Sequence, residues 1–438
     1  MAAPTSSPSP SSPSPEPTAL PPLWSDRDYR GWWTANTVSA LGTSMSAIAY
    51  PLLVLYSTGS VASAGAITAA QLVGTLVTTL YGGALADRVS RKAILVVAPL
   101  VQAAALTAVA VLVGAGSPAL VVLMACALVS GAAAGFGAGA TNPALRRIVP
   151  KEQLGTAASQ ELGRDAAADL LGAPLGGLLF SAARWIPFAA DAASFLVASL
   201  GAALIRRPLG PDAAGDRASV LADIRAGFAL VRRERFLRFV VVWGSLLNVV
   251  AQGFALLFIA LVRHRGGSPA TVGFVSSLAL IGGIAGAVIA PALLRTVRAR
   301  LVLHVSAWAF VASFAAVALV PQPWQIGAVM LVAMLFMVPL NVVLEAYLVR
   351  LVPDEFSGRV SAVTRFGGQA LQWSGPLLAG LLAAVLGVPG GALALMALTV
   401  PLALALHLTR SLDVLDLPLE QVEEIPVPQP EPAQGQRA

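Results

Sequence analysis

Long apolar segments separated by short polar connections dominate the sequence. A helix needs about 20 mostly apolar residues to cross the hydrocarbon layer of a bilayer. Twelve segments of about that length are predicted to be helices: 31–56, 61–86, 92–114, 117–141, 154–181, 184–206, 237–262, 268–293, 299–320, 324–349, 358–386 and 388–409. Several connections are only a few residues long and carry turn residues, so neighbouring helices are expected to run antiparallel.

The composition agrees with a chain that lies mostly in lipid. Hydrophobic residues make up 57% of the 438 positions and charged residues only 11%, whereas about a quarter of a soluble chain is charged. Too few polar side chains are present to coat a surface that faces water. The predicted fold class is therefore an all-α integral membrane protein with twelve transmembrane helices.

The longest internal polar stretch, residues 207–236, divides these helices into six and six. We interpret it as a cytoplasmic linker, with an amphipathic surface helix in its second part. The helices then form an N-terminal bundle over 25–206 and a C-terminal bundle over 237–410. The ends, 1–24 and 411–438, are rich in Pro with Ser or acidic residues, a composition typical of disordered tails.

Lysine and arginine are distributed unequally between alternate connections. With a cytoplasmic N-terminus, the outer connections hold only Arg184, Arg263 and Arg265, and all other loop arginines and lysines lie inside. This bias predicts that both termini are cytoplasmic. It also accounts for the excess of basic residues without a nucleic-acid partner. Abundant arginine and alanine indicate a GC-rich bacterial genome, so the predicted location is the bacterial cytoplasmic membrane.

The two predicted halves contain matching blocks. Arg147-Ile-Val-Pro-Lys-Glu152 follows the fourth helix, and Arg350-Leu-Val-Pro-Asp-Glu355 follows the tenth. Further on, Gly172-Ala-Pro-Leu-Gly-Gly-Leu178 resembles Gly375-Pro-Leu-Leu-Ala-Gly-Leu381. We infer an internal duplication, which places the substrate path between two pseudo-symmetric six-helix bundles near the membrane midplane.

The sequence lacks the usual signs of catalytic or metal chemistry. Cys126 is the single cysteine, and His264, His304 and His407 do not have metal-ligand spacing. No phosphate-binding loop, nucleophile elbow or zinc-protease motif occurs. We therefore expect no enzyme activity, no cofactor and no direct use of ATP.

The loop after the second predicted helix reads Gly83-Ala-Leu-Ala-Asp87-Arg88-Val-Ser-Arg91-Lys92. It resembles the signature loop of the major facilitator superfamily, with serine in place of the second glycine, and the resemblance extends over residues 25–410. It implies a conformational latch that favours the outward-open state.

A negative charge at this loop has a physical use, because Asp87 can face the positive N-terminal end of another helix. The eleventh predicted helix, which begins near Ser357, is the expected partner. The alternative is that the loop is an ordinary positive-inside signal, but Asp87 adds nothing to such a signal.

Four ionisable residues of the fifth predicted helix, Glu161, Arg164, Asp165 and Asp169, share one face by their spacing. Ionisable groups inside a membrane are costly unless paired or wetted, so they are candidates for function. Arg164 can pair with Glu161 or Asp165, which leaves Asp169 less compensated and able to take up and release protons. The alternative is a structural ion-pair cluster. Glu345 is a further proton-coupling candidate.

Other polar residues in predicted helices are candidates for lining a substrate cavity: Asn36, Asn248, Gln252, Asn341, Arg365, Gln369, Gln372 and Trp373. Asp169 and Gln372 occupy corresponding positions of the two repeats. Asp191, near the outer end of the sixth helix, is expected to be interfacial.

Two further blocks, Ser39–Leu55 and Pro187–Phe195, resemble bacterial exporters of siderophores and macrolide-like drugs within this superfamily. The resemblance implies proton-coupled export of a hydrophobic or amphipathic small molecule, by a protein expected to be monomeric. The alternatives are an uptake permease for a metabolite and a non-transporting membrane receptor or scaffold.

Overall fold

The computed structural model describes residues 21–86, 89–116, 119–210 and 228–425, and these residues form helices joined by short turns. The first half contains α1 (Arg27–Thr58), α2 (Val61–Ala86), α3 (Arg91–Gly114), α4 (Leu120–Ile148), α5 (Leu154–Ala182) and α6 (Ile186–Leu204). The second half contains α8 (Arg235–His264), α9 (Pro269–Thr296), α10 (Ala299–Leu319), α11 (Pro323–Leu351), α12 (Asp354–Gln369), α13 (Ser374–Ala397) and α14 (Thr399–Leu408). Single 3-10 turns lie at Leu23–Ser25, Lys151–Gln153 and Leu419–Gln421, and a longer one at Arg410–Asp416.

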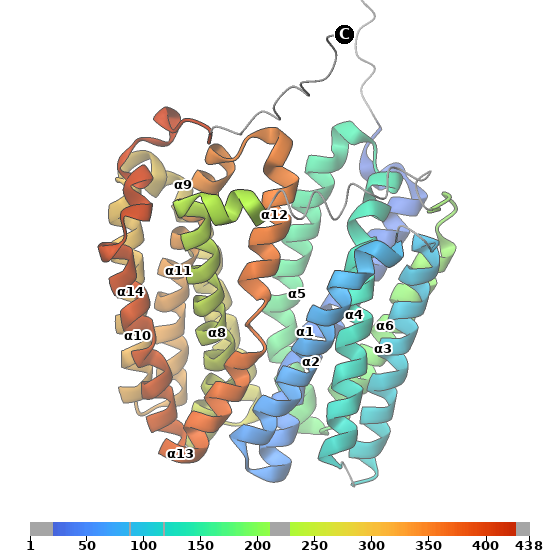
Figure 1. The fold of residues 1–438 in the computed structure, drawn as a ribbon. Coiled ribbons are helices and arrows are strands. Elements are labelled where there is room, and N and C mark those ends of the chain that lie inside the picture. Colours follow the sequence, from blue (N-terminus) through green and yellow to red (C-terminus); the bar gives the residue numbers. More distant parts are fainter. Residues whose placement is uncertain (1–20, 87–88, 117–118, 211–227, 426–438) are drawn as a thin grey trace, which may run out of the picture.

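The helices form two bundles, α1–α6 and α8–α14, that stand side by side (Figure 1). We call the end where α1 begins and α11 ends the termini end, and the end where α1 ends and α9 begins the opposite end. The ribbons of the two bundles approach each other at the opposite end and diverge toward the termini end (Figure 1).

The predicted helices agree with the observed ones, but several continue past the apolar stretch. Helix α4 was predicted to end at residue 141 and reaches Ile148, beyond two arginines. It ends where Val149 adopts an extended conformation before Pro150. Proline disfavours a helical conformation of the residue before it. Hydropathy therefore marks the lipid layer, whereas local backbone chemistry ends the helix.

The duplicated block adopts the same conformation in both halves. Val149 and Val352 both cap a helix in an extended conformation, and each donates its N–H to the carbonyl four residues earlier. Pro150 and Pro353, which follow them, have nearly identical backbone angles. The internal repeat inferred from the sequence is therefore visible in the local structure.

The eleventh predicted helix, 358–386, is interrupted. Residues 370–373 form turns between α12 and α13, so Gln372 and Trp373 lie in this break rather than on a continuous helix. Arg365 and Gln369 therefore lie on α12, and Gln372 does not continue the same helix. The next predicted connection appears as a kink, because Gly387 has a φ of 73°.

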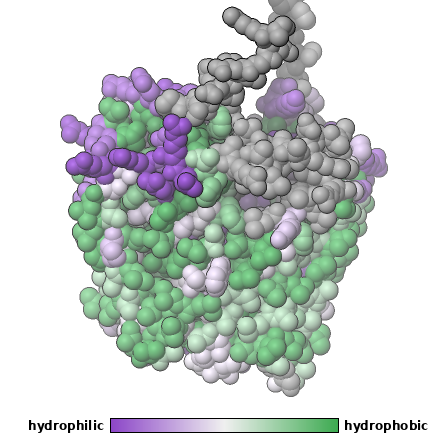
Figure 2. Space-filling view, viewed as in Figure 1, coloured by the Kyte–Doolittle hydropathy of each residue, from purple (hydrophilic) through white to green (hydrophobic). Residues whose placement is uncertain are grey.

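Ten segments of the described residues are long and apolar enough to span a membrane. One of them, Val360–Leu408, runs through two predicted spans, and α5, which carries four ionisable residues, is not among the ten. The predicted twelve spans are compatible with this result. Exposed apolar side chains cover the flanks of the molecule, and hydrophilic residues gather at the termini end (Figure 2).

Ordered structure extends into both segments that were predicted to be disordered tails. On the C-terminal side, Leu412, Leu415 and Val422 are buried, and the Ile425 N–H donates to the Leu351 carbonyl. The prediction of disorder from residue 411 was therefore wrong for residues 411–425, because spaced apolar residues anchor this segment on the bundle. On the N-terminal side, Leu23 is likewise buried. Residues 1–20 and 426–438 lie outside the described residues.

The second part of the linker includes a short helical stretch at residues 228–233. Leu230 and Val231 are buried, whereas Arg232 and Arg233 are exposed. Phe228 of the same stretch is exposed, and the amphipathic surface helix stays a prediction.

Candidate functional site

The ionisable residues of α5 lie against the first part of α1. Arg164 forms salt bridges with Asp165 (2.8 Å from Nη2 to Oδ1) and, at longer range, with Glu161 (3.8 Å from Nη1 to Oε1). Glu161 also accepts a hydrogen bond from the indole N–H of Trp32 (3.2 Å). The pairing expected from the sequence spacing is therefore present, and one guanidinium serves two carboxylates.

Asp169 lies farther along α5 and is exposed. It accepts a hydrogen bond from the Ser44 hydroxyl of α1 (2.5 Å), and it takes part in none of the salt bridges found among the described residues. The next carbonyl, of Leu170, accepts a hydrogen bond from Ser277 of α9 (3.0 Å). The least compensated carboxylate of α5 thus lies directly beside a contact between the two bundles.

Glycines form a pseudo-symmetric contact between the bundles at the opposite end. Gly273 of α9 packs on the backbone of Ala173 in α5, and a Cβ added to Gly273 would lie only 2.8 Å from the Pro174 Cα. In the same way, Gly65 of α2 packs on the backbone of Pro376 in α13. Ala173 and Pro376 are equivalent residues of the duplicated block. We call these two glycine contacts between the bundles the seam, and the duplicated block supplies one side of each contact.

Polar groups add to the seam at the ends of α1 and α8. The Arg263 guanidinium lies over the Tyr56 ring, 4.6 Å from its centroid, and donates to the Leu55 carbonyl. The Tyr56 hydroxyl donates to the Gly267 carbonyl (3.2 Å). Close backbone packing and these bonds together hold the opposite end closed.

Three of the candidates for lining a substrate cavity donate hydrogen bonds to backbone carbonyls three or four residues earlier in the chain. Asn36 donates to the Trp32 carbonyl (2.8 Å), Asn248 to the Gly244 carbonyl (3.0 Å), and the Trp373 indole to the Ala370 carbonyl (3.0 Å). Such bonds leave each amide oxygen available as an acceptor.

The remaining candidates differ in exposure. Gln252 and Gln372 are half-buried, Asn341, Glu345 and Gln369 are exposed, and the side chain of Arg365 lies outside the described residues. The end of α12 approaches Asn248 of α8, since a Cβ on Gly368 would lie 3.8 Å from the Asn248 Nδ2. The structure therefore groups the α8 and α12 candidates, while Asn36 and the α5 residues belong to the other bundle.

The predicted latch loop is described only in part. Gly83 lies near the end of α2, and Asp87 and Arg88 lie outside the described residues. Arg91 is buried, and the Lys92 Nζ donates to the Ile205 carbonyl at the end of α6 (2.7 Å). Lys92 thus joins two helices of one bundle, and the proposed contact between bundles stays a prediction.

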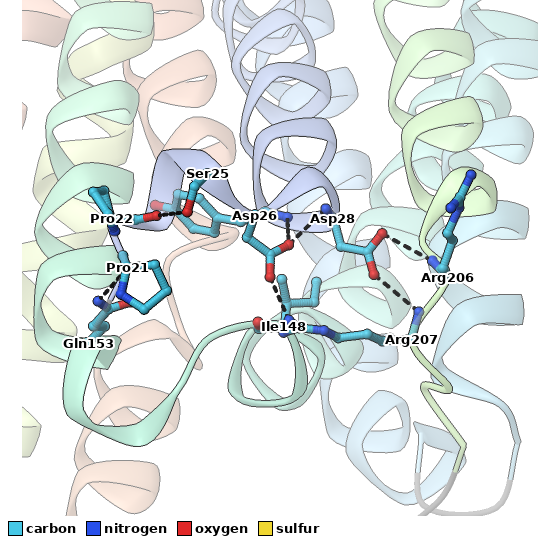
Figure 3. Close-up of polar contacts among 10 residues, drawn as sticks. Pro21, Pro22, Ser25, Asp26, Asp28, Ile148, Gln153, Arg206 and Arg207 are labelled. Carbon is cyan, nitrogen blue, oxygen red and sulfur yellow. Dashed lines mark hydrogen bonds and ion pairs between the residues drawn. The ribbon is translucent and has the colours of Figure 1, made fainter. Parts of the chain in front are cut away.

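A polar cluster at the termini end escaped the sequence analysis. Asp26 caps α1 by accepting from the backbone N–H groups of Asp28 (2.8 Å) and Tyr29 (3.1 Å). Its second carboxylate oxygen pairs with Arg207 (2.5 Å), which also donates to the Ile148 carbonyl at the end of α4 (Figure 3).

Asp28 completes this cluster by accepting from the backbone N–H groups of Arg206 (3.2 Å) and Arg207 (3.1 Å) after α6 (Figure 3). The beginning of α1 and the ends of α4 and α6 are therefore fastened together. An aspartate just before an apolar helix is a recognised N-cap signal that could have indicated Asp26. The partners on α4 and α6 have no local signal.

Replacing Asp26 with alanine is expected to lower the stability of the N-terminal bundle. Loss of a helix N-cap costs about 1 kcal/mol, and Arg207 would lose its carboxylate partner. We expect a fall of a few degrees in the thermal-unfolding midpoint of the purified protein in lipid nanodiscs. Arg30→Ala, an exposed change in the first turns of α1, is the matched control, and equal midpoints for the two variants would contradict the expectation.

Asp191 differs most from its expected position. It was expected to be interfacial, yet it is 1% exposed and lies between α6 and α1, where its carboxyl group contacts the hydroxyls of Ser46 and Ser194. Its burial arises from the packing of α1 on α6, which hydropathy along one helix does not reveal.

Known proteins with similar sequences and structures are membrane transporters. Macrolide efflux protein A of Streptococcus pyogenes is 25% identical over 276 residues, which are 58% of this chain and 67% of the relative. Among solved structures, the nucleoside transporter NupG has a TM-score of 0.71 at 15% identity, covering 87% of this chain and 98% of its own.

A bacterial homologue of the lysosomal transporter Spinster, in an inward-facing and unoccupied conformation, has a TM-score of 0.67 at 12% identity, covering 89% of this chain and 97% of its own. A bacterial homologue of the iron transporter ferroportin, in an inward-facing state, has a TM-score of 0.63 at 16% identity, covering 86% and 98%. At these identities the structures define the fold. The family model of the Major Facilitator Superfamily matches residues 32–371. With its two helical bundles, its duplicated seam and this match, the chain belongs to the major facilitator superfamily of multi-pass membrane transporters.

Proposed function

We propose that this transporter exports a hydrophobic or amphipathic small molecule in exchange for protons, by alternating access between its two bundles. The observation that carries the proposal is the position of Asp169, an exposed carboxylate within α5 that lies beside the contact between the bundles. A proton that binds there neutralises a charge next to the surface that has to separate during transport. Proton binding and bundle movement would then be coupled at one place.

One relative supports the proposed direction of transport, and the chemistry of the candidate residues supports the proposed class of solute. Similarity to macrolide efflux protein A favours export of a drug-like or secondary-metabolite-like solute. The candidate lining residues are mostly uncharged amides and a tryptophan, which suit an amphipathic solute better than a strongly charged one. We take Asn36, Asn248, Gln252, Asn341, Gln369, Gln372 and Trp373 as proposed substrate contacts, with Arg365 and Glu345 as charged additions.

We place the termini end in the cytoplasm of a bacterial cell, in accord with the positive residues of its connections. The closed opposite end then corresponds to an inward-facing arrangement of a monomer. In this setting the loop from Gly83 to Lys92 is proposed to latch the bundles together at the cytoplasmic end during the outward-open state, with Asp87, Arg88 and Arg91 as its charged groups.

The test is accumulation of a radiolabelled macrolide in bacteria with and without the protein, before and after a protonophore collapses the proton gradient. Export predicts lower accumulation in cells that carry the protein, rising to the level of the control cells on collapse. Uptake, the second candidate, predicts higher accumulation that falls on collapse. Equal accumulation in both strains for a macrolide and a panel of amphipathic dyes would contradict the proposed substrate class.

A further inference from the structure

A buried polar group in the N-terminal bundle lies on the far side of α1 from Asp169. Asp191 is the only ionisable residue of α6, and it is 1% exposed. Gly42 of α1 permits this contact, because a Cβ there would lie 2.6 Å from the Asp191 Oδ1. The carboxyl group is therefore held tightly between two helices and away from water.

The nearby hydroxyls offer few hydrogens for a carboxylate. Ser194 Oγ lies within hydrogen-bonding distance of both the carbonyl oxygen (2.8 Å) and Oδ1 (3.1 Å) of Asp191. Ser46 Oγ contacts the Asp191 Oδ2 and also the Thr43 carbonyl (3.2 Å). Each serine has a single hydrogen, so two hydrogens face four acceptors. The two serine hydroxyls are the donors to the carboxyl group, and a proton on that group would add a third donor, which Ser46 Oγ can accept.

No positively charged group compensates Asp191 within the described part of the chain. Asp191 takes part in none of the salt bridges found among the described residues. Helix α3, which packs on α6, has Arg91 and Lys92 only, at its termini end. A buried carboxylate without a cation is unfavourable inside a membrane protein.

Two other ionisable side chains face this region. Tyr50 is one turn from Ser46 on α1, and its ring packs against Phe188, one turn from Asp191 on α6 (5.0 Å between centroids). Its hydroxyl is buried and lacks a hydrogen-bond partner among the described residues. Cys126 of α4 is partly buried and packs against the same hydrophobic core that contains Tyr50. From α5, the groups that reach α1 are Glu161, which binds Trp32, and Asp169, which binds Ser44.

Ser44 and Ser46 link the two carboxyl groups through α1. Residues two apart on a helix point about 200° apart, so Ser44 faces Asp169 on α5 while Ser46 faces Asp191 on α6. A rotation or shift of α1 during transport would change both contacts at once.

We propose that Asp191 is a buried proton-binding site, neutral in the arrangement described here, that releases its proton when α1 shifts on α6. In this step the shift of α1 admits water, the carboxylic acid of Asp191 loses one proton to that water and becomes a carboxylate, and the serine hydroxyls keep their protons. The inference rests on the proposed proton coupling, to which it adds a second site.

Infrared difference spectroscopy of the purified protein in lipid nanodiscs tests this directly. The carbonyl stretch of a protonated, buried carboxyl group should be present in the wild type, shift on exchange into heavy water, and disappear in Asp191→Asn. The matched control Asp169→Asn should keep the band. Absence of the band from the wild type, or its persistence in Asp191→Asn, would overturn the proposal.

A second variant serves if Asp191→Asn does not fold. Ser46→Ala leaves the carboxyl group but removes its acceptor, so the band should move in frequency, and an unmoved band would refute the assignment. The outcome is separable from the proposed function. If the protein shows the band but no proton-driven export, the buried proton site stands and the proposed function is wrong. If it exports in a proton-driven manner but shows no band, the proposed function stands and the buried proton site is wrong.

Discussion

Substituting alanine for Gly273 is expected to open the seam at the opposite end of the bundles. The added Cβ would lie 2.8 Å from the Pro174 Cα, and this neighbour is backbone that cannot rotate away. Overpacking of this kind costs about 1–3 kcal/mol, which corresponds to a shift of roughly 5- to 150-fold between the closed and open arrangements. Transport should fall because the cycle requires both arrangements.

Thiol accessibility measures this shift. In a Cys126→Ala background, Ser277→Cys places a thiol at a buried seam position. A membrane-impermeant maleimide, added from the side that the opposite end is proposed to face, should label it faster when Gly273→Ala is also present. Gly283→Ala is the matched control on the same helix, because its Cβ would meet only the Val338 Cγ2 at 3.7 Å. Equal labelling of the two variants would show that the seam does not control access.

The equivalent contact in the other half of the seam allows the same experiment to be repeated. Gly65 packs on Pro376 as Gly273 packs on Ala173, so Gly65→Ala should produce the same increase in labelling. A response to only one of the two changes would mean that the pseudo-symmetric contacts are energetically unequal.

Replacing Asp169 with asparagine is expected to uncouple transport from protons. The amide keeps an oxygen that can accept from Ser44, so the contact between α1 and α5 survives while the proton-binding carboxylate is lost. Because the amide cannot bind and release a proton in the way the proposed coupling requires, we expect substrate-dependent proton flux in proteoliposomes to fall roughly tenfold or more. Binding of substrate should be retained.

Asp413→Asn provides the control for that measurement. Asp413 is an exposed carboxylate of the C-terminal segment and pairs with Arg300, far from α5 in the sequence. Its replacement should leave proton flux unchanged. If Asp169→Asn also retained the full flux, the coupling role proposed for α5 would be wrong, whatever the effect on other residues.

The site could be predicted from the sequence only where it depends on spacing along one helix. Arg164 lies within reach of Glu161 and Asp165 because these residues share a face of α5, and the structure contains both pairs. The exposure of Asp169 and the burial of Asp191 could not be predicted in this way. Both are aspartates in predicted helices and both contact α1, but the packing of α1 on α6 buries Asp191 whereas Asp169 on α5 stays exposed.

The break in the chain after α12 could not be predicted from the sequence either. The apolar run predicted one helix, but Gln372 and Trp373 lie in a break between α12 and α13. Ser245 of α8 donates to the Gly367 carbonyl at the end of α12, and α13 packs its Gly375 on the backbone of Val249 in α8. Hydropathy is insensitive to such a break, because partners on another helix can satisfy the freed backbone groups.

By itself the sequence determined the class of protein, the approximate positions of most helices and the duplication. Lipid imposes length and apolarity on each span, and these requirements are local and therefore readable in the chain. The tertiary structure alone decided that Gly65 and Gly273 meet backbone of the other bundle, and that Asp191 lies buried behind α1. These contacts join residues about a hundred or more positions apart, so they depend on how helices pack against one another, which no local pattern specifies.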